Sequence, residues 1–343
     1  MNDQAVPSPV VSGRPAPPLG RARRIVGGLV LAFLTMAALV HPLAALLSRR
    51  SWLAELISHF QHLGLLMTLV ALGVALRRAR RRALVLGALA LAQAFPLFRF
   101  SGPNPVPPDP SSTDRVRLLM ANLLVENSNH DALVRLIRRE RPDIVGLVEF
   151  SNEWREGLEE VRRDYPYRVE VPLGARGLAL WFREPPRKIH PPETPGALCW
   201  PLLHAEIDFA GRPRHLWLVH PRSPFIRRGY PEHAALADRI WSFGGSRVVM
   251  GDLNLSEGSP LFGDFLRDTA LRDTRLGFGR QPTWPADWPY RIAIDHAFVS
   301  ADLAVADRRL GPEIGSDHFP LIFDLAPARS AESSGSKPPS QAK

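Results

Sequence analysis

The hydrophobic residues of the chain follow two different patterns along its length. The first part contains three long apolar runs, at 25–47, 52–76 and 83–98, separated by short arginine-rich segments. The first run has 23 residues without a formal charge, enough to cross the ~30 Å hydrocarbon core of a bilayer at ~1.5 Å per residue. The pattern predicts an all-α membrane module with about three transmembrane helices. Two spans are the alternative, because the third run has only 16 residues.

Polar side chains, Glu55, His59, Gln61 and His62 among them, interrupt the first half of the second apolar run. Glu55, His59 and His62 recur at helical spacing, so one face of a helix would carry all three. Such a set could bind a metal ion. Polar packing between helices or at the membrane interface is the simpler interpretation, and we prefer it.

Beyond residue 113 the apolar runs become short and alternate with amphipathic stretches. Runs typical of strands occur at 115–124, 143–150, 177–182, 202–210, 214–220, 247–254, 292–300 and 319–325. Helices are predicted at 130–140, at 152–165 and around 231–243. Many strands and few helices favour an α+β layered sandwich, because a doubly wound parallel sheet needs a helix after nearly every strand.

Proline-rich and polar segments mark the boundaries between these parts. We expect a disordered cytoplasmic N-terminus, a membrane module, a Pro-rich linker, one soluble domain and a disordered tail, at 1–24, 25–98, 99–113, 114–327 and 328–343 respectively. The chain has one cysteine, Cys199, which excludes an intramolecular disulfide framework.

The net charge of +9 and a pI near 10.6 at first suggest a nucleic-acid-binding protein. Its distribution changes that interpretation. Residues 1–113 carry 12 arginines against three acidic residues, whereas residues 114–343 carry 31 basic and 31 acidic residues. The excess charge therefore flanks the apolar runs and gives no argument for DNA binding by the soluble domain.

The arginines also predict an orientation in the membrane. With three spans, the clusters at 21–24 and 77–82 lie on the same side, which the positive-inside rule places in the cytoplasm. The soluble domain would then lie on the outer, periplasmic side of a cell (inner) membrane. A cleaved signal peptide is the alternative, but the first run is long for one and further apolar runs follow it.

Polar residues recur at or just beyond the ends of the predicted strands. They are Asn122, Glu149, His220, Asp252, Asn254, Asp295, Asp317 and His318. Taken singly, each has a structural explanation, such as a turn or a helix cap. Several carboxylates at neighbouring strand ends repel one another unless a cation joins them, and oxygen ligands without thiolates suit Mg²⁺ or Mn²⁺. Together these residues favour a metal-dependent site.

Five segments carry a resemblance to a known family. LLMANLL, DIVGLVEF, GDLN, IDHAFVS and GSDHFPLIFDL resemble the endonuclease/exonuclease/phosphatase superfamily of deoxyribonuclease-like hydrolases, in a membrane-anchored bacterial form. The resemblance covers about 115–326. It implies a four-layered α/β sandwich, in which two packed mixed β-sheets are flanked by helices. It also implies hydrolysis of a P–O bond by an activated water with a divalent metal.

The resemblance assigns three residues to the metal. Glu149 is similar to the family's principal metal carboxylate, Asp317 to a second metal ligand, and Asn122 to the asparagine that helps bind metal or phosphate. The chain departs from some nuclease members at Leu124, where they carry an acidic residue. That departure argues against a further metal ligand at this position.

The resemblance also assigns five catalytic residues. Asp252 and Asn254 match the pair that positions the attacking water and binds the phosphoryl oxygen. His220 is similar to the histidine that contacts the scissile phosphate. His318 would act in proton transfer, and Asp295 would orient His318 by a hydrogen bond.

The substrate is left open among a nucleic acid, a phospholipid headgroup and a small phosphoester. The loop at 281–291 resembles the family's PTW-containing loop beside the substrate, with Trp284 and Arg291 as substrate-binding candidates; packing around its prolines is the structural alternative. Arg222, shortly after His220, is a further candidate. A catalytically inactive, membrane-anchored binding or scaffold protein with the same fold is the alternative function.

Overall fold

The computed structural model describes residues 19–194, 200–223 and 230–329. Most of the two terminal segments predicted to be disordered, 1–24 and 328–343, lies outside these ranges. The prediction is wrong for residues 19–24, because a helix already begins at Leu19.

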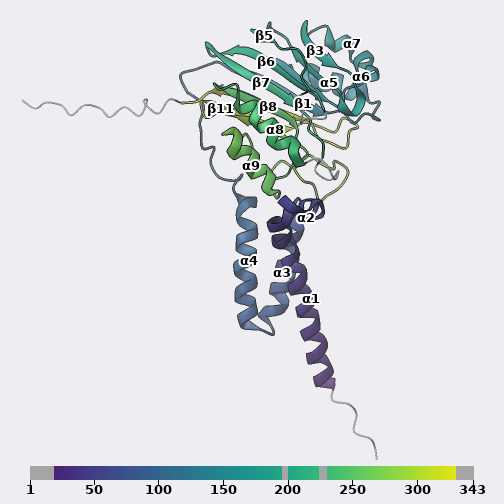
Figure 1. Ribbon diagram of the computed structural model, residues 1–343, viewed down its shortest axis with the longest axis vertical. Coiled ribbons are helices and arrows are strands. Elements are labelled where there is room, and N and C mark those ends of the chain that lie inside the picture. The colour runs from purple at the N-terminus through teal and green to yellow at the C-terminus, as the bar shows by residue number, and fades with distance from the viewer. Residues whose placement is uncertain (1–18, 195–199, 224–229, 330–343) are drawn as a thin grey trace, which may run out of the picture.

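The N-terminal region is helical, as the apolar runs predict. It consists of α1 (Leu19–Leu47), the 3₁₀ turn η1 (Ser48–Arg50), α2 (Trp52–Ser58), α3 (Gln61–Leu76) and α4 (Arg80–Phe98). Figure 1 shows α1, α3 and α4 below the soluble domain. Small side chains fill much of the space between them, including Ala38, Ala71 and Ala83, which lets the helix backbones approach closely.

Two of these helices, α1 and α4, are long and apolar enough to cross a membrane by themselves. The run at 52–76 is not one straight helix, because α2 and α3 meet at a bend of 72°. The helical region therefore has two candidate spans, or three if the bent pair counts as one.

The two large arginine clusters lie at the same end of the helical region. The start of α1 and the turn between α3 and α4 both lie at the end opposite the soluble domain (Figure 1). Arg78 lies against Gly27, since a Cβ built on Gly27 would be 1.1 Å from Arg78 Nη1. This arrangement agrees with the sequence prediction that the clusters share one side.

The soluble domain contains two six-stranded mixed sheets. The first has the order β11 (Leu303–Leu310), β12 (Leu321–Pro327), β1 (Val116–Asn122), β2 (Ile144–Val148), β4 (Leu178–Phe182), β3 (Tyr167–Val171). The second has the order β5 (Lys188–Ile189), β6 (Leu202–Phe209), β7 (Arg212–Val219), β8 (Arg247–Asp252), β10 (Asp295–Val299), β9 (Arg272–Asp273). Among the strands of the described residues, only the pairs β1–β2 and β7–β8 are parallel.

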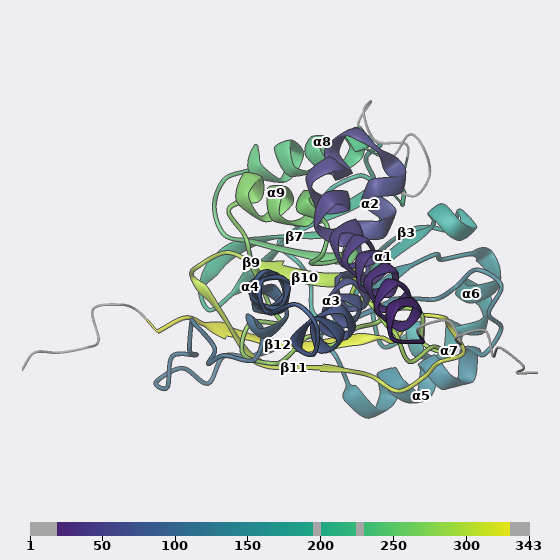
Figure 2. The same ribbon diagram turned by 90° about the horizontal axis from the view of Figure 1, so that it is seen from below.

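Helices cover the outer face of each sheet, so the domain has four layers. The first sheet is covered by α5 (His130–Glu140), α6 (Asn152–Gly157) and α7 (Glu159–Arg162), and the second by α8 (Tyr230–Trp241) and α9 (Pro260–Thr269). The turn η2 (Gly174–Arg176) precedes β4. Figure 2, seen from the side of the helical region, shows the two sheets between the two groups of helices. The predicted four-layered sandwich is confirmed.

Three apolar clusters hold these layers together. The largest lies between the sheets and includes Met120, Leu218 and Phe323. The sheets approach closely at Gly146, where an added Cβ would be 2.5 Å from the Met250 methyl group and would displace it. The packing places the ends of β1, β2 and β8 near one another.

The Pro-rich segment 99–113 packs on the soluble domain. Phe100 is buried, and its carbonyl oxygen accepts hydrogen bonds from the Gly277 and Gly279 amides. Asn104 Nδ2 donates to the Val305 carbonyl oxygen at 2.9 Å. These contacts fix the path of the chain between α4 and β1.

Candidate active site

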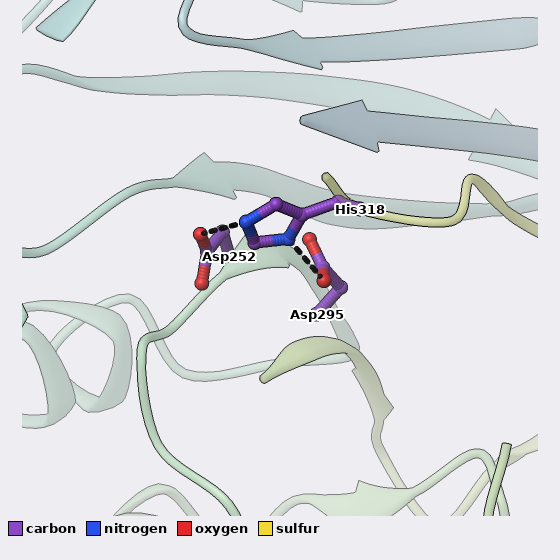
Figure 3. Close-up of side chains that lie close together, drawn as sticks. All are labelled: Asp252, Asp295 and His318. Atoms are coloured by element: carbon purple, nitrogen blue, oxygen red, sulfur yellow. Dashed lines mark hydrogen bonds and ion pairs between the residues drawn. The ribbon is translucent and has the colours of Figure 1, made fainter. Parts of the chain in front are cut away.

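Ends of strands from both sheets converge at one place. Asn122 ends β1, Glu149 follows β2, and Asp252 ends β8. Asp295 begins β10 and pairs directly with Asp252 across the antiparallel ladder. His318 comes from the segment before β12 and lies between these two carboxylates (Figure 3).

His318 is held by two acidic side chains. Its Nδ1 is 2.8 Å from Asp295 Oδ2, and its Nε2 is 3.8 Å from Asp252 Oδ2. Burial by itself would lower the pKa of His318, but the Asp295 carboxylate, helped by Asp252 and Asp317, raises it to about 10. The imidazole is therefore protonated at neutral pH and presents a charged N–H donor.

Asn122 connects the carboxylates of the two sheets. Its amide nitrogen donates to Glu149 Oε1 and to Asp252 Oδ2, both at 3.0 Å. Its Oδ1 accepts from the Leu124 amide at 3.0 Å. The Asn122 side chain therefore holds one acid from each sheet, and the Leu124 amide fixes its oxygen.

Burial perturbs both of these acids. Desolvation, followed by repulsion from Asp295, raises the pKa of Asp252 to about 7. Desolvation also raises the pKa of Glu149, against hydrogen bonds from Asn122 and Val125. A carboxyl group that titrates near neutral pH can accept a proton from water.

His220 lies on the other side of Asp252. Its Nε2 is 3.6 Å from Asp252 Oδ2, and its ring packs edge-on against Trp200 at 4.7 Å between centroids. Burial, together with the nearby charge of His318, lowers the pKa of His220 to about 3. This histidine is neutral where His318 is cationic.

The backbone at the strand ends is strained. Glu149 and Asn254 have positive φ values of 58° and 53°, which residues other than glycine seldom adopt. Asn254 N donates to Asp252 Oδ1 at 2.8 Å, and Asn254 Nδ2 donates to the Pro221 carbonyl oxygen at 3.2 Å. These bonds fix the turn that presents Asp252.

Asp317 lies on the open side of the site. Its side chain is 38% exposed, its Oδ1 is 3.8 Å from His318 Nε2, and its Oδ2 accepts from Trp284 Nε1 at 2.9 Å. Glu149 is half-buried. Two carboxylates with access to solvent therefore lie beside the buried acids and His318.

The donor set fits a hard divalent cation. Asp252, Asp295 and His318 form a buried cluster whose ligand atoms lie within 4.8 Å of one another, and which could hold a metal ion. The raised pKa of Asp252 shows that negative charge is poorly compensated here. The half-buried Glu149 and the partly exposed Asp317 add carboxylate oxygens beside that cluster, and such oxygens are the ligands that Mg²⁺ and Mn²⁺ prefer.

The three candidate substrate-binding residues have different surroundings. Trp284 Nε1 donates its hydrogen bond to Asp317, as described above. The Arg291 guanidinium lies over the Phe319 ring, 4.7 Å from its centroid. Arg222 Nε donates to the buried carboxylate of Glu232 at 2.6 Å, which holds the guanidinium in place.

Two supporting hydroxyl groups were not predicted. Ser316 Oγ accepts from the His318 amide at 3.1 Å, and Thr283 Oγ1 accepts from the Asp295 amide at 3.3 Å. The signal was available in the segments GSDH and PTW, where each hydroxyl residue stands next to a predicted site or substrate residue.

The comparisons with known proteins agree with this geometry. The sequence profile of the Endonuclease/Exonuclease/phosphatase family matches residues 121–318, more than half of the chain. The chain belongs to this family. It is a metal-dependent phosphoester hydrolase of the endonuclease/exonuclease/phosphatase type, with the buried Asp252, Asp295 and His318 cluster at its active site. No curated protein matches the chain.

Solved structures share the fold of the soluble domain. D. rerio TDP2 complexed with a single strand DNA product is 17% identical, with a TM-score of 0.50 over 62% of this chain and 98% of that chain. The endonuclease/exonuclease/phosphatase from Bacteroides vulgatus is 19% identical, with a TM-score of 0.50 over 62% of this chain and 99% of that chain. These similarities show the four-layered fold and leave the substrate of this chain open.

Proposed function

We propose that the protein is a membrane-anchored phosphoesterase that depends on Mg²⁺ or Mn²⁺, and that Glu149 and Asp317 hold the ion on the open side of the site. When bound, the ion would polarise the phosphoryl group and neutralise its charge. Asn122 orients Glu149 towards that position. The observation that supports the proposal best is the buried His318, hydrogen-bonded to Asp295 and facing Asp252.

The remaining residues divide the proton transfers between them. Asp252, with a pKa of about 7, is placed to accept a proton from the attacking water, which Asn254 helps to position. His318, with a pKa of about 10, gives its Nε2 proton to the leaving oxygen as the P–O bond breaks, and so stabilises the negative charge that develops there. Neutral His220 is a second donor to the scissile phosphate.

The helical region would anchor this active site at a membrane. We infer that residues 25–98 form the anchor, that 114–327 form the catalytic domain, and that the domain lies on the periplasmic side of a bacterial inner membrane. Support comes from the apolar helices α1 and α4 and from the arginine clusters at the far end of the region.

Hydrolysis of a generic aryl phosphodiester by the full-length protein in nanodiscs tests the proposal. Activity should need Mg²⁺ or Mn²⁺ and disappear with EDTA. Asp252→Ala should lower kcat by about 10²–10⁴-fold, because it removes the proton acceptor. Asp268→Ala, an exposed acid beside Arg267, is the matched control and should leave kcat unchanged. An Asp252→Ala variant as active as the wild type would refute the mechanism. Absence of turnover in the wild type would favour a catalytically inactive scaffold protein.

A substrate panel then separates the classes of phosphoester. The solved D. rerio TDP2 structure holds a single strand DNA product, so oligonucleotides belong in the panel. Lipid headgroups and small sugar or inositol phosphates complete it. The balanced charge of residues 114–343 predicts no strong salt dependence for a nucleic-acid substrate.

A further inference from the structure

The bend between α2 and α3 docks directly onto the loop that follows the active-site turn. Ser256 N donates to His59 Nδ1 at 3.2 Å, and Ser256 Oγ donates to the His59 carbonyl oxygen at 3.3 Å. Ser259 Oγ bonds the Glu55 carboxylate. Because Ser256 lies only two residues beyond Asn254, the helical region packs next to the active site.

The contact between the helical region and the soluble domain is close, and its central side chains are buried. The side chains of Glu55 and His59 are completely buried. A Cβ built on Gly258 would be 2.2 Å from the Ser58 carbonyl oxygen, so only glycine fits there. Arg49 of η1 pairs with Asp264 of α9 at 2.8 Å. The polar half of the run at 52–76 therefore attaches the domain to the helices. Glu55 and His59 pack against a loop of the soluble domain, and not against another helix or at the membrane interface as expected.

A second loop of the domain reaches the same bend. Tyr290 stacks on His62 with 6.2 Å between ring centroids and an angle of 11°. The Trp288 ring lies edge-on to the Tyr290 ring, with 6.3 Å between the ring centroids. The same loop begins with Trp284, which bonds Asp317 in the active site. One short loop thus runs from the active-site rim to the first residues of α3.

The aromatic side chains at this junction face outward. Trp288 is 56% exposed and Tyr290 47%, and Trp52 of α2 is 42% exposed. Large aromatic side chains are normally buried in a water-soluble domain, whereas Trp and Tyr concentrate where a protein crosses the boundary between water and lipid. Trp52 begins α2, which lies where the helices meet the domain (Figure 1), and Tyr290 reaches the same bend through its stacking on His62.

We propose that Trp288 and Tyr290, together with Trp52, form a rim that lies in the interfacial layer of the bilayer, and that the active site acts on phosphoester groups in lipid headgroups at that surface. The substrate part of this inference rests on the proposed phosphoesterase activity; the membrane contact does not. The occupant of the rim is a lipid surface, because the exposed aromatic side chains continue the apolar helices that end beside them.

Depth-dependent quenching tests the membrane contact. A fluorophore is attached at Trp288→Cys in a Cys199→Ser background, with the full chain in nanodiscs that contain lipids with nitroxide groups near the headgroup. We expect loss of fluorescence at position 288. The matched control is Tyr167→Cys, because Tyr167 is 42% exposed on the edge strand β3, and it should lose none. Equal fluorescence at both positions would overturn the membrane contact.

Activity on a bilayer-borne phospholipid and on a soluble phosphodiester tests the substrate class. The double variant Trp288→Ser, Tyr290→Ser should lower kcat/KM roughly tenfold for a bilayer-borne phospholipid, because headgroups are presented less well when the rim is lost. Turnover of a soluble aryl phosphodiester should stay at the wild-type level. An equal loss on both substrates would place the loop in the active site instead.

The outcomes separate this inference from the proposed function. Wild-type turnover of the aryl phosphodiester without turnover of any headgroup would refute the lipid substrate and leave the phosphoesterase standing. Absence of all turnover would refute the phosphoesterase and with it the lipid substrate, while the quenching comparison would still decide the membrane contact.

Discussion

His318 has a chemical state that depends on one neighbouring residue. Asp295 accepts a 2.8 Å hydrogen bond from its Nδ1, and the second ring nitrogen is left facing Asp252 and Asp317. His220, a few ångströms away across Asp252, has no such partner and its pKa is lowered to about 3. Two histidines in one site therefore have opposite charge states at neutral pH, set by their neighbours.

Replacing Asp295 by Asn should shift the pH dependence of the reaction. The Asp295 carboxylate raises the pKa of His318 to about 10, so wild-type activity, which needs the protonated imidazole, falls only as the pH rises through that value. Without the charge, the pKa falls and the alkaline loss of activity begins at lower pH. The pH profile of kcat measures this shift. An unchanged alkaline limb would mean that His318 is not the proton donor.

The identity of the site residues could be predicted from the sequence, but their contacts could not. Each of the eight predicted residues stands at or near a strand end, and the structure brings all eight together. Asn122, Glu149, Asp252, Asp295 and His318 lie at the centre, and His220, Asn254 and Asp317 lie beside them. Which side-chain atoms form hydrogen bonds with one another depends on how the side chains are oriented in the folded protein. No sequence pattern indicates that Asn122 turns its nitrogen towards the acids, or that Arg222 is taken up by Glu232.

At the scale of elements, the strands that the sequence analysis missed share one property. They are β3, β5, β9 and β11, the outermost strands of the two sheets. Central strands have apolar residues on both faces and read as continuous runs. Edge strands carry charges, as in LAVADRRL of β11, and β5 and β9 have only two residues each. The hydrophobic pattern therefore predicted the central strands of each sheet but missed the edge strands.

A buried ion network joins elements around the active-site loops. Arg275 is fully buried and bonds Glu257 at 3.0 Å and Asp273 at 2.8 Å, while its guanidinium lies 4.2 Å from the centroid of the Phe100 ring. Burial would raise the pKa of Glu257, but Arg275 and Arg280 lower it to about 2. The network connects the segment after α4, the loop after β8 and strand β9.

Replacing Arg275 by Met should destabilise the protein by about 3–5 kcal/mol, because it leaves two buried carboxylates without their cation. Thermal or denaturant unfolding of the full chain in detergent, followed by tryptophan fluorescence, measures the change. Arg267→Met is the matched control: its side chain is 66% exposed beside Asp264 and Asp268, so the effect should stay within about 0.5 kcal/mol. Equal stabilities of the two variants would contradict a structural role for the network.

At the scale of the whole molecule, the excess positive charge belongs to the helical region and gives no argument about the substrate. The arginine clusters lie at the far end of the helical region, and the soluble domain is electrically balanced. The sequence indicated three spans or two. It could not reveal the 72° bend, because Glu55 and His59, which lie at the bend, find their partners Ser259 and Ser256 about 200 residues later in the chain.

A topology measurement tests the orientation. In bacterial cells, alkaline phosphatase fused after residue 329 should be active, because the positive-inside rule places the soluble domain outside the cytoplasm. A fusion after Ala79, in the turn between α3 and α4, is the internal control and should be inactive. The reverse pattern would place the catalytic domain in the cytoplasm.

The central claim is that His318 and the neighbouring carboxylates make a metal-dependent phosphoesterase. A titration of Mg²⁺ against aryl phosphodiester hydrolysis tests it most directly, in the wild type, Glu149→Gln and His318→Ala. We expect Glu149→Gln to need more Mg²⁺ for half-maximal activity, since a ligand is lost. We expect His318→Ala to lose at least about 10²-fold in kcat at saturating Mg²⁺. Wild-type kcat in His318→Ala, or activity that EDTA does not remove, would contradict the account.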